Sequence, residues 1–280
     1  MLAGNGISIP NRDHPMSDLQ VTTGLVAVFD ILGYQNFVDN NSVKDAAEKV
    51  LKAVAALETE IPELTAKTFY TKTKGVENWI SSSKRLILSD TILFSVPAPP
   101  PSQKAKIDET QDDVGVWIAF LIQCIVLGRH MFAYGLPVRG AIGYGEFYVE
   151  QNCLFGRPIM DAYRKMQQLD FVGSVMLPDT TTLWKSKIIA HVKSPRFLGN
   201  FLGADYLAPL RGDTEEKLFV LNSLCRKDDD PDITSGDIRQ TVLGAFFAHN
   251  KDVPESVMSK VRNTEKLLRF LKLKFPNPIS

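Results

Sequence analysis

The sequence lacks several features that would assign it to a broad functional class. Lys plus Arg and Asp plus Glu balance at 32 each, so no global field attracts nucleic acid or an anionic membrane. The three cysteines are an odd number without CxxC spacing, which favours reduced thiols over a disulfide framework or a zinc site. The four histidines lie far apart and show no ligand spacing. What remains is a chain with 44% hydrophobic and 23% charged residues, which is typical of a globular protein.

Motifs for common phosphate and hydrolase chemistry are also absent. Neither GxSxG nor GxxxxGK[ST] occurs, and the first predicted strand lacks the DxD start of a haloacid-dehalogenase-type phosphatase. Residues 1–20 contain no basic-then-apolar pattern, so we expect an N-terminal tail and no signal peptide. The apolar stretch 114–128 is interrupted by Gln123 and is shorter than the ~20 residues of a membrane span, which favours a core helix. We therefore expect a soluble, cytoplasmic protein.

Hydrophobic periodicity predicts a central sheet with helices between its strands. Strands are predicted at 21–30, 136–151, 174–179 and 218–224, with a hairpin of two strands at 85–96. Helices are predicted at 42–61, 114–134, 157–169, 235–249 and 254–274. The proline cluster in residues 97–113 predicts a solvated loop. Strands and helices alternate, so the fold class is α/β or α+β.

Two carboxylates stand where apolar strand sequence ends. Asp30 follows LVAVF, and Asp90 follows RLILS. If the two strands are neighbours, both acids emerge at one edge of the sheet, and they would repel each other unless a dication such as Mg²⁺ or Mn²⁺ lies between them. Gly33 would let backbone amides approach a phosphate. Taken singly, each acid could instead cap a turn or occupy a hairpin corner; together they favour a metal–triphosphate site.

Four motifs, in order over about residues 25–170, resemble those of class III nucleotidyl cyclases. FDILGYQNF is similar to the first metal-binding strand and turn of that family, and LILSDTILF to its second metal-binding hairpin. PVRGAIGYGEFYV resembles the cyclase strand R-x-G-I-x-x-G, and CLFGRPIMDAYRKM resembles the helix start that follows it. The resemblance implies an α+β, ferredoxin-like (palm-type) catalytic domain over residues 21–184, with a central, mainly antiparallel sheet and flanking helices. Residues 185–280 would be a mostly helical C-terminal extension of the same globule.

The resemblance also implies roles for individual residues. Asp30 and Asp90, with the Ile31 carbonyl, match the ligands of two Mg²⁺ or Mn²⁺ ions per active site. The turn that cradles the triphosphate corresponds to Ile31, Leu32, Gly33 and Tyr34. Arg164 matches the transition-state arginine, which in this family reaches the partner protomer's site, so a homodimer is expected.

The helix that carries Arg164 departs from the family pattern at one position. The asparagine four residues before the arginine is replaced by Met160. Asp161 is adjacent, but its side chain would leave the helix about 100° away. In the family, the asparagine replaced by Met160 is the residue that positions the ribose.

The positions that read the base in purine cyclases align with Leu86 and Cys153. Adenylate cyclases usually have Lys with Asp or Thr there, and guanylate cyclases usually have Glu with Cys. Cys153 fits the guanine pattern, but Leu86 can neither accept from guanine nor donate to adenine, and a missing partner lowers discrimination between bases by ~10⁴-fold. Alternatively, Leu86 is a plain strand residue and the base is read elsewhere.

The chain looks most like the pyrimidine cyclases of Pycsar antiphage systems, which combine these metal motifs with a broken purine code. This resemblance implies conversion of UTP, or alternatively CTP, to cUMP or cCMP, with a separately encoded effector that reads the product. Two alternatives stay open. One is a guanylate or adenylate cyclase with an unusual base pocket, and the other is a catalytically silent nucleotide-binding module that signals through its C-terminal helices.

Overall fold

The computed structural model describes residues 21–52, 55, 83–98, 109–150, 153–191, 202–223 and 237–275. The elements in chain order are β1 (Thr22–Ile31), α1 (Tyr34–Asp39), β2 (Lys84–Leu88), β3 (Thr91–Pro97), α4 (Glu109–Ala133), β4 (Val138–Glu150), β5 (Cys153–Gly156), α5 (Arg157–Gln168), β6 (Gly173–Met176), α6 (Pro178–Leu183), β7 (Gly203–Leu210), β8 (Thr214–Leu221), α8 (Ile238–Phe247) and α9 (Met258–Lys274). A further helix runs through residues 43–52 and is capped by the Ser42 hydroxyl, which accepts from the Asp45 amide at 3.1 Å. The predicted N-terminal tail lies outside the described residues, as does most of the predicted loop 97–113.

One sheet joins the eight strands of the described residues in the order β2-β3-β1-β4-β6-β8-β7, with β5 paired to β4. Every neighbouring pair is antiparallel except β4–β6, which is parallel. The first part of the chain has the βαββαβ order with its strands arranged β2-β3-β1-β4, which is the ferredoxin-like arrangement. The predicted α+β fold with a mainly antiparallel sheet and flanking helices is confirmed.

Both faces of the sheet are covered, which explains why β1 is a nearly continuous apolar run. Leu25, Ala27 and Phe29 belong to the core that contains α4, α1 and the helix at 43–52. Val26 and Val28 belong to the core that contains α5 and α9. Since side chains alternate along a strand, Asp30 lies on the α5 face.

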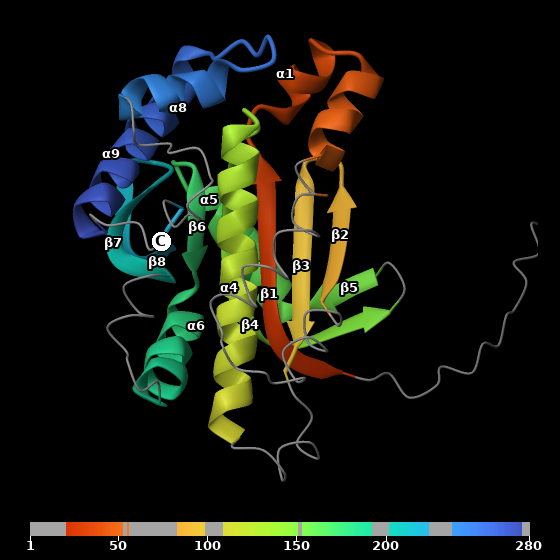
Figure 1. Ribbon diagram of the computed structural model, residues 1–280, viewed down its shortest axis with the longest axis vertical. Coiled ribbons are helices and arrows are strands. Elements are labelled where there is room, and N and C mark those ends of the chain that lie inside the picture. The colour runs from red at the N-terminus through yellow and green to blue at the C-terminus, as the bar shows by residue number, and fades with distance from the viewer. Residues whose placement is uncertain are drawn as a thin grey trace, which may run out of the picture.

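The helix α4 crosses one face of the sheet in the foreground of Figure 1. It begins at Glu109, so residues 109–113 are helical and the expectation of a loop there was wrong. Its segment Val114–Ala133 is long and apolar enough to cross a membrane by length and composition, so the sequence argument from shortness was also wrong. However, 83% of that apolar window is buried inside the protein, which agrees with a core helix.

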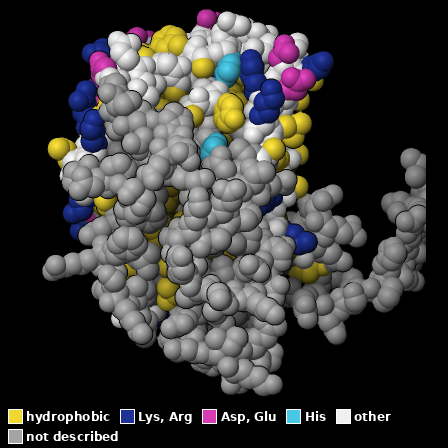
Figure 2. Space-filling model, viewed as in Figure 1, with side chains coloured by type: hydrophobic (Ala, Val, Ile, Leu, Met, Phe, Trp, Pro, Cys, Tyr) yellow, Lys and Arg dark blue, Asp and Glu magenta, His cyan; other side chains and the backbone are white. Residues whose placement is uncertain are grey.

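The C-terminal part of the chain contributes strands as well as helices. The sequence patterns did not predict β7, which pairs with β8 along its whole length. The helices α8 and α9 were predicted, and they form a third apolar cluster with Phe132 of α4 and Val172. In Figure 1 they lie at the same end of the molecule as α1. At this end of the molecule, Figure 2 shows basic, acidic and histidine side chains on the surface.

Candidate functional site

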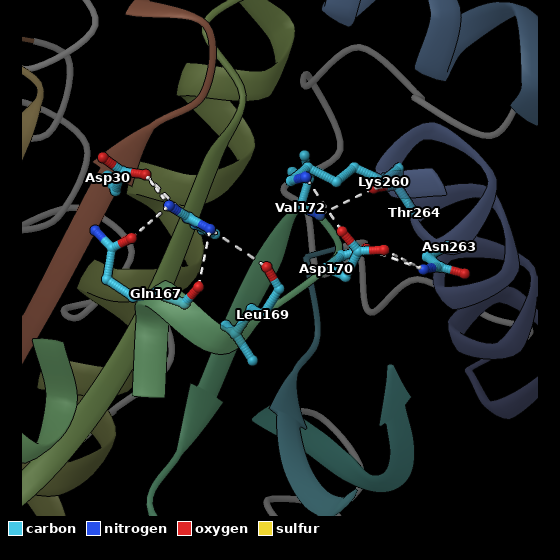
Figure 3. A network of polar contacts seen from close by, with 9 residues as sticks. Asp30, Gln167, Leu169, Asp170, Val172, Lys260, Asn263 and Thr264 are labelled. Atoms are coloured by element: carbon cyan, nitrogen blue, oxygen red, sulfur yellow. Dashed lines mark hydrogen bonds and ion pairs between the residues drawn. The ribbon is translucent and has the colours of Figure 1, made fainter. Parts of the chain in front are cut away.

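Asp30 is the penultimate residue of β1 and lies beside an arginine on the neighbouring strand. In the antiparallel register Asp30 is paired with Arg139 of β4. The Arg139 Nε and Nη2 atoms donate to Asp30 Oδ2 at 2.9 and 2.8 Å, and the two side chains are 4% and 13% exposed. Arg139 also donates to the Gln167 side-chain oxygen at 3.1 Å, and to the carbonyls of Gln167 and Leu169 at 3.3 and 3.4 Å. Figure 3 shows these contacts converging between β1 and the end of α5.

Burial raises the pKa of the Asp30 carboxyl above its ordinary value, and the charge and hydrogen bonds of Arg139 act against that rise. The Asp90 carboxylate adds to the rise, which means that the two acids are close enough to repel, and Arg211 acts in the opposite direction. The expectation that only a dication could relieve this repulsion was therefore wrong, because Arg139 supplies a counter-charge within the chain.

Asp90 occupies the two-residue turn between β2 and β3. Leu88 and Thr91 are paired across this turn, and Ser89 has a left-handed backbone with φ of 58°. The Ile31 amide donates to the Asp90 carbonyl at 2.9 Å, so the turn is fastened to the end of β1. The structure thus brings Asp30 and Asp90 together at one edge of the sheet.

The donors at this edge suit one divalent cation. Both contacts from Arg139 fall on Oδ2 of Asp30, and in Figure 3 the other carboxylate oxygen points away from them. Asp90 is partly exposed and can supply a second hard oxygen ligand. The described part of the chain holds no group of three or more His, Cys, Asp or Glu that could hold a metal ion, so further ligands would come from a backbone carbonyl such as that of Ile31 or from substrate phosphate.

The turn after Asp30 is held by backbone contacts at both ends. The Leu32 amide donates to the Pro137 carbonyl, and the Phe37 amide donates to the Gly33 carbonyl, both at 2.9 Å. Gly33 has a φ of 73°, a left-handed backbone that favours glycine, and Tyr34 begins α1 directly after it. A Cβ on Gly33 would lie 3.5 Å from the Lys251 Cδ atom, so a C-terminal residue lies against this turn.

Arg164 lies on α5, away from the two aspartates. Its side chain is 68% exposed and pairs with Asp161 at 3.4 Å, an exposed ion pair of the kind that contributes little to stability. It lines a cleft of about 850 Å³, and neither Asp30 nor Asp90 is among the residues lining that cleft. Within one chain, the structure does not bring Arg164 to the aspartates.

Leu86 and Cys153, the positions that the family resemblance aligns with base reading, lie on strands that are not neighbours. Leu86 is half-buried on the edge strand β2, and Cys153 is exposed at the start of β5. Met160, at the usual asparagine position, is 50% exposed on α5. No role of these residues follows from their placement alone.

Sequence reasoning missed four residues of this site. Arg139 stood inside the quoted strand motif without an assigned partner, although a single arginine in an apolar and glycine-rich strand was a usable signal. Gln167 contacts it from the end of α5, and the charge of Arg211 acts on Asp30 from the β7–β8 turn. Nothing in the sequence pattern pointed to Lys251.

No family model matches the sequence, and no curated protein matches it. The chain is similar to the solved catalytic core of a rhodopsin-guanylyl cyclase with converted specificity in complex with ATPαS, at 13% identity and a TM-score of 0.40 over 72% of this chain and 96% of that one. It is also similar to the guanylyl cyclase Cya2, at 12% identity and a TM-score of 0.37 over 72% and 91%. A bacterial light-regulated adenylyl cyclase matches at 10% identity and a TM-score of 0.41 over 83% and 58%. These values describe a distant likeness of fold, and they assign no activity to this chain.

Proposed function

We propose that this chain is a cytoplasmic class III-type nucleotidyl cyclase that converts a pyrimidine nucleoside triphosphate to its 3′,5′-cyclic monophosphate and pyrophosphate. The observation that carries the proposal is the meeting of Asp30 and Asp90 at one edge of a ferredoxin-like sheet, directly before the glycine turn at Gly33. These are the positions at which the sequence motifs resemble the metal-binding and triphosphate-binding parts of that family.

The chain's own residues would divide the work as follows. The Asp30 and Asp90 carboxylates would supply hard-oxygen ligands for a divalent cation beside the ribose and phosphates. Arg139 fixes the orientation of the Asp30 carboxylate through its two contacts with Oδ2. Gly33 has a left-handed backbone and no side chain, so the backbone amides of this turn would be the groups that meet the triphosphate. When bound, one Mg²⁺ or Mn²⁺ ion held by Asp30 and Asp90 would lower the pKa of the ribose 3′-hydroxyl, and the second ion that the family resemblance implies would neutralise the leaving pyrophosphate.

We further propose that the working enzyme is a homodimer with two equivalent sites. Arg164 is exposed in a cleft apart from the aspartates of its own chain, so it is free to reach the site of a second copy. Large apolar side chains are exposed around it, namely Phe155, Met160 and Tyr163 at 74%, 50% and 42%. Exposed apolar surface of this kind is typical of a protein–protein contact.

The choice of base rests on Leu86 and Cys153. A leucine at the first position removes the group that reads either purine, which favours a pyrimidine, and UTP is favoured over CTP by resemblance to the Pycsar cyclases. In such a system the cyclic nucleotide would act as a second messenger for a separately encoded effector during phage infection.

The test is to incubate the purified protein with each of the four ribonucleoside triphosphates and Mn²⁺ and to identify cyclic products by mass spectrometry. The proposal expects a product from UTP or CTP and none from ATP or GTP; a purine product alone would refute the pyrimidine assignment. Asp90→Ala should abolish cyclisation. Asp90 is the better variant because Asp30→Ala would leave the buried Arg139 without its partner.

A second candidate is a silent nucleotide-binding module. Met160 at the usual asparagine position favours it, because a methionine has no hydrogen-bond donor and only a weak acceptor for a ribose hydroxyl. The absence of a cyclic product from all four nucleotides, together with Mn²⁺-dependent binding of one of them, would support this candidate over the cyclase.

A further inference from the structure

The segment between α8 and α9 lies against the chain's first helix, α1, and the two residues that follow its end. The Asn40 and Asn41 side-chain amides donate to the carbonyls of Asn250 and His249, both at 2.8 Å. The Asp252 amide donates to the Asn36 side-chain oxygen at 2.7 Å. Three asparagines in and just after α1 therefore bind the main chain of residues 249–252, more than 200 positions later in the sequence.

Lys251 is the buried centre of the 249–252 segment. It is 5% exposed, and its ammonium donates to the Gly135 carbonyl at 2.6 Å and to the Ala245 carbonyl at 3.2 Å. The apolar stem of the side chain lies beside Gly33, and the ammonium ties the end of α4 to the end of α8. One side chain thus connects the ends of α4 and α8 with the turn that follows Asp30.

Two residues of the 249–252 segment have an uncommon backbone conformation. His249 and Asn250 both have left-handed φ angles, 62° and 58°, which are uncommon for residues other than glycine. Gly135 faces this segment so closely that a Cβ there would lie 2.3 Å from the Ala248 Cβ atom. Strained backbone persists where surrounding contacts over-determine it, and such sites are frequently functional.

We propose that Lys251 is a positioning residue for the Ile31–Tyr34 turn, and that through it the C-terminal extension shapes the substrate site. The catalytic part of this inference rests on the proposed cyclase function. Lys251 does not touch the reacting atoms; it supports Gly33 from behind and fixes the turn relative to the ends of α4 and α8. The C-terminal helices, for which the sequence offered no role, then act as a support for the site.

The first test measures hydrogen–deuterium exchange of the full chain without nucleotide. Lys251→Met removes the ammonium and keeps a side chain of similar length, and Lys266→Met removes an exposed charge from α9 as the matched control. Lys251→Met should raise exchange at residues 31–37 by roughly tenfold while leaving the β1 core at residues 24–29 unchanged, and Lys266→Met should change neither. Unchanged exchange at 31–37, or a uniform rise throughout the protein, would overturn the proposal.

The second test measures cyclisation kinetics with Mn²⁺ and UTP. Lys251→Met should raise KM roughly tenfold with kcat retained within about twofold, because a loosened turn weakens binding more than chemistry. An unchanged KM would overturn the positioning role, since a merely structural role lowers only the unfolding temperature. If the wild-type protein makes no product from any nucleotide, the cyclase proposal fails, and the exchange experiment still decides whether Lys251 holds the turn.

Should Lys251→Met fail to fold, a variant pair at Asn36 replaces it. Asn36→Ala removes the acceptor for the Asp252 amide, whereas Asn36→Asp keeps it. Faster exchange at residues 31–37 in Asn36→Ala, restored in Asn36→Asp, supports the proposal. Equal exchange in the two variants contradicts it.

Discussion

Replacing Arg139 by methionine should destabilise the protein more than an ordinary core substitution. The guanidinium is 4% exposed and directs two donors at Asp30 Oδ2, at 2.9 and 2.8 Å. Arg139→Met would leave a buried carboxylate without its counter-charge, and breaking a buried ion pair costs about 3–5 kcal/mol. The carbonyls of Gln167 and Leu169 would lose donors as well. We therefore expect the free energy of unfolding to fall by about 4 kcal/mol at pH 7.5.

The pH dependence of this loss is a further check. Burial already raises the pKa of Asp30 above its ordinary value, so between the two values the folded state binds the extra proton and stability falls as pH rises. Arg139 opposes that rise, so its removal moves the pKa of Asp30 further up. The variant can then relieve part of its cost by protonating Asp30, and the loss should be smaller at pH 5 than at pH 7.5.

Urea unfolding of a double-mutant cycle measures the effect. Asp30→Asn combined with Arg139→Met removes both charges, and it should recover about 2 kcal/mol relative to Arg139→Met alone. The reasoning is refuted by a loss below about 1 kcal/mol in Arg139→Met, or by a double variant no more stable than the single one.

Three further outcomes are expected. Burial lowers the pKa of Lys251 to about 8 from its ordinary 10.5, so the unfolded state binds more protons between these values and stability rises with pH. Relative to Lys251→Met, urea unfolding should show the wild type gaining about 3 kcal/mol from pH 7 to 10.5, at ~1.36 kcal/mol per pH unit. A stability difference that does not change with pH would contradict this. Gly140→Ala should lower stability by about 1–3 kcal/mol in thermal unfolding, because its Cβ would lie 2.4 Å from the Phe29 ring. Gly128→Ala on α4, where nothing lies within 4 Å of the added Cβ, should be neutral or stabilising by up to about 1 kcal/mol. A larger loss in Gly128→Ala than in Gly140→Ala would contradict the β1–β4 packing. Asp90→Ala should change the urea midpoint little, because Asp90 is only partly buried, and a large loss would mean that its role is structural.

The local patterns near Asp30 were sufficient to predict the strand and the hairpin, and they placed Asp30 and Asp90 together only on the condition that the two elements are neighbours. An unbroken apolar run requires burial on both faces, and a two-residue Ser-Asp step between apolar segments specifies a tight hairpin, so β1, β2 and β3 followed directly. That β1 and β3 are neighbours was a condition of the prediction, and the structure shows them paired in a ferredoxin-like order.

The contacts that hold Asp30 could not be predicted from local patterns, because they depend on register and on segments that meet only in the folded chain. The partnership with Arg139 requires knowing that residue 30 lies opposite residue 139 across β1 and β4. The contact between Lys251 and Gly33 joins positions more than 200 apart. The strand β7 was missed because its run GADYLAPL has a proline and little alternation, and its pairing with β8 makes it a strand.

The most direct test of the central claim is complementation between two inactive variants in the UTP cyclisation assay with Mn²⁺. Asp90→Ala lacks a proposed metal ligand, and Arg164→Ala lacks the group proposed to act on the partner's site, so each should be inactive alone. If the site is shared between two chains, an equimolar mixture allowed to exchange subunits should regain about a quarter of wild-type activity, because about half of the dimers are mixed and each has one intact site. A mixture as inactive as the two single variants, or an Arg164→Ala protein as active as the wild type, would contradict a shared cyclase site.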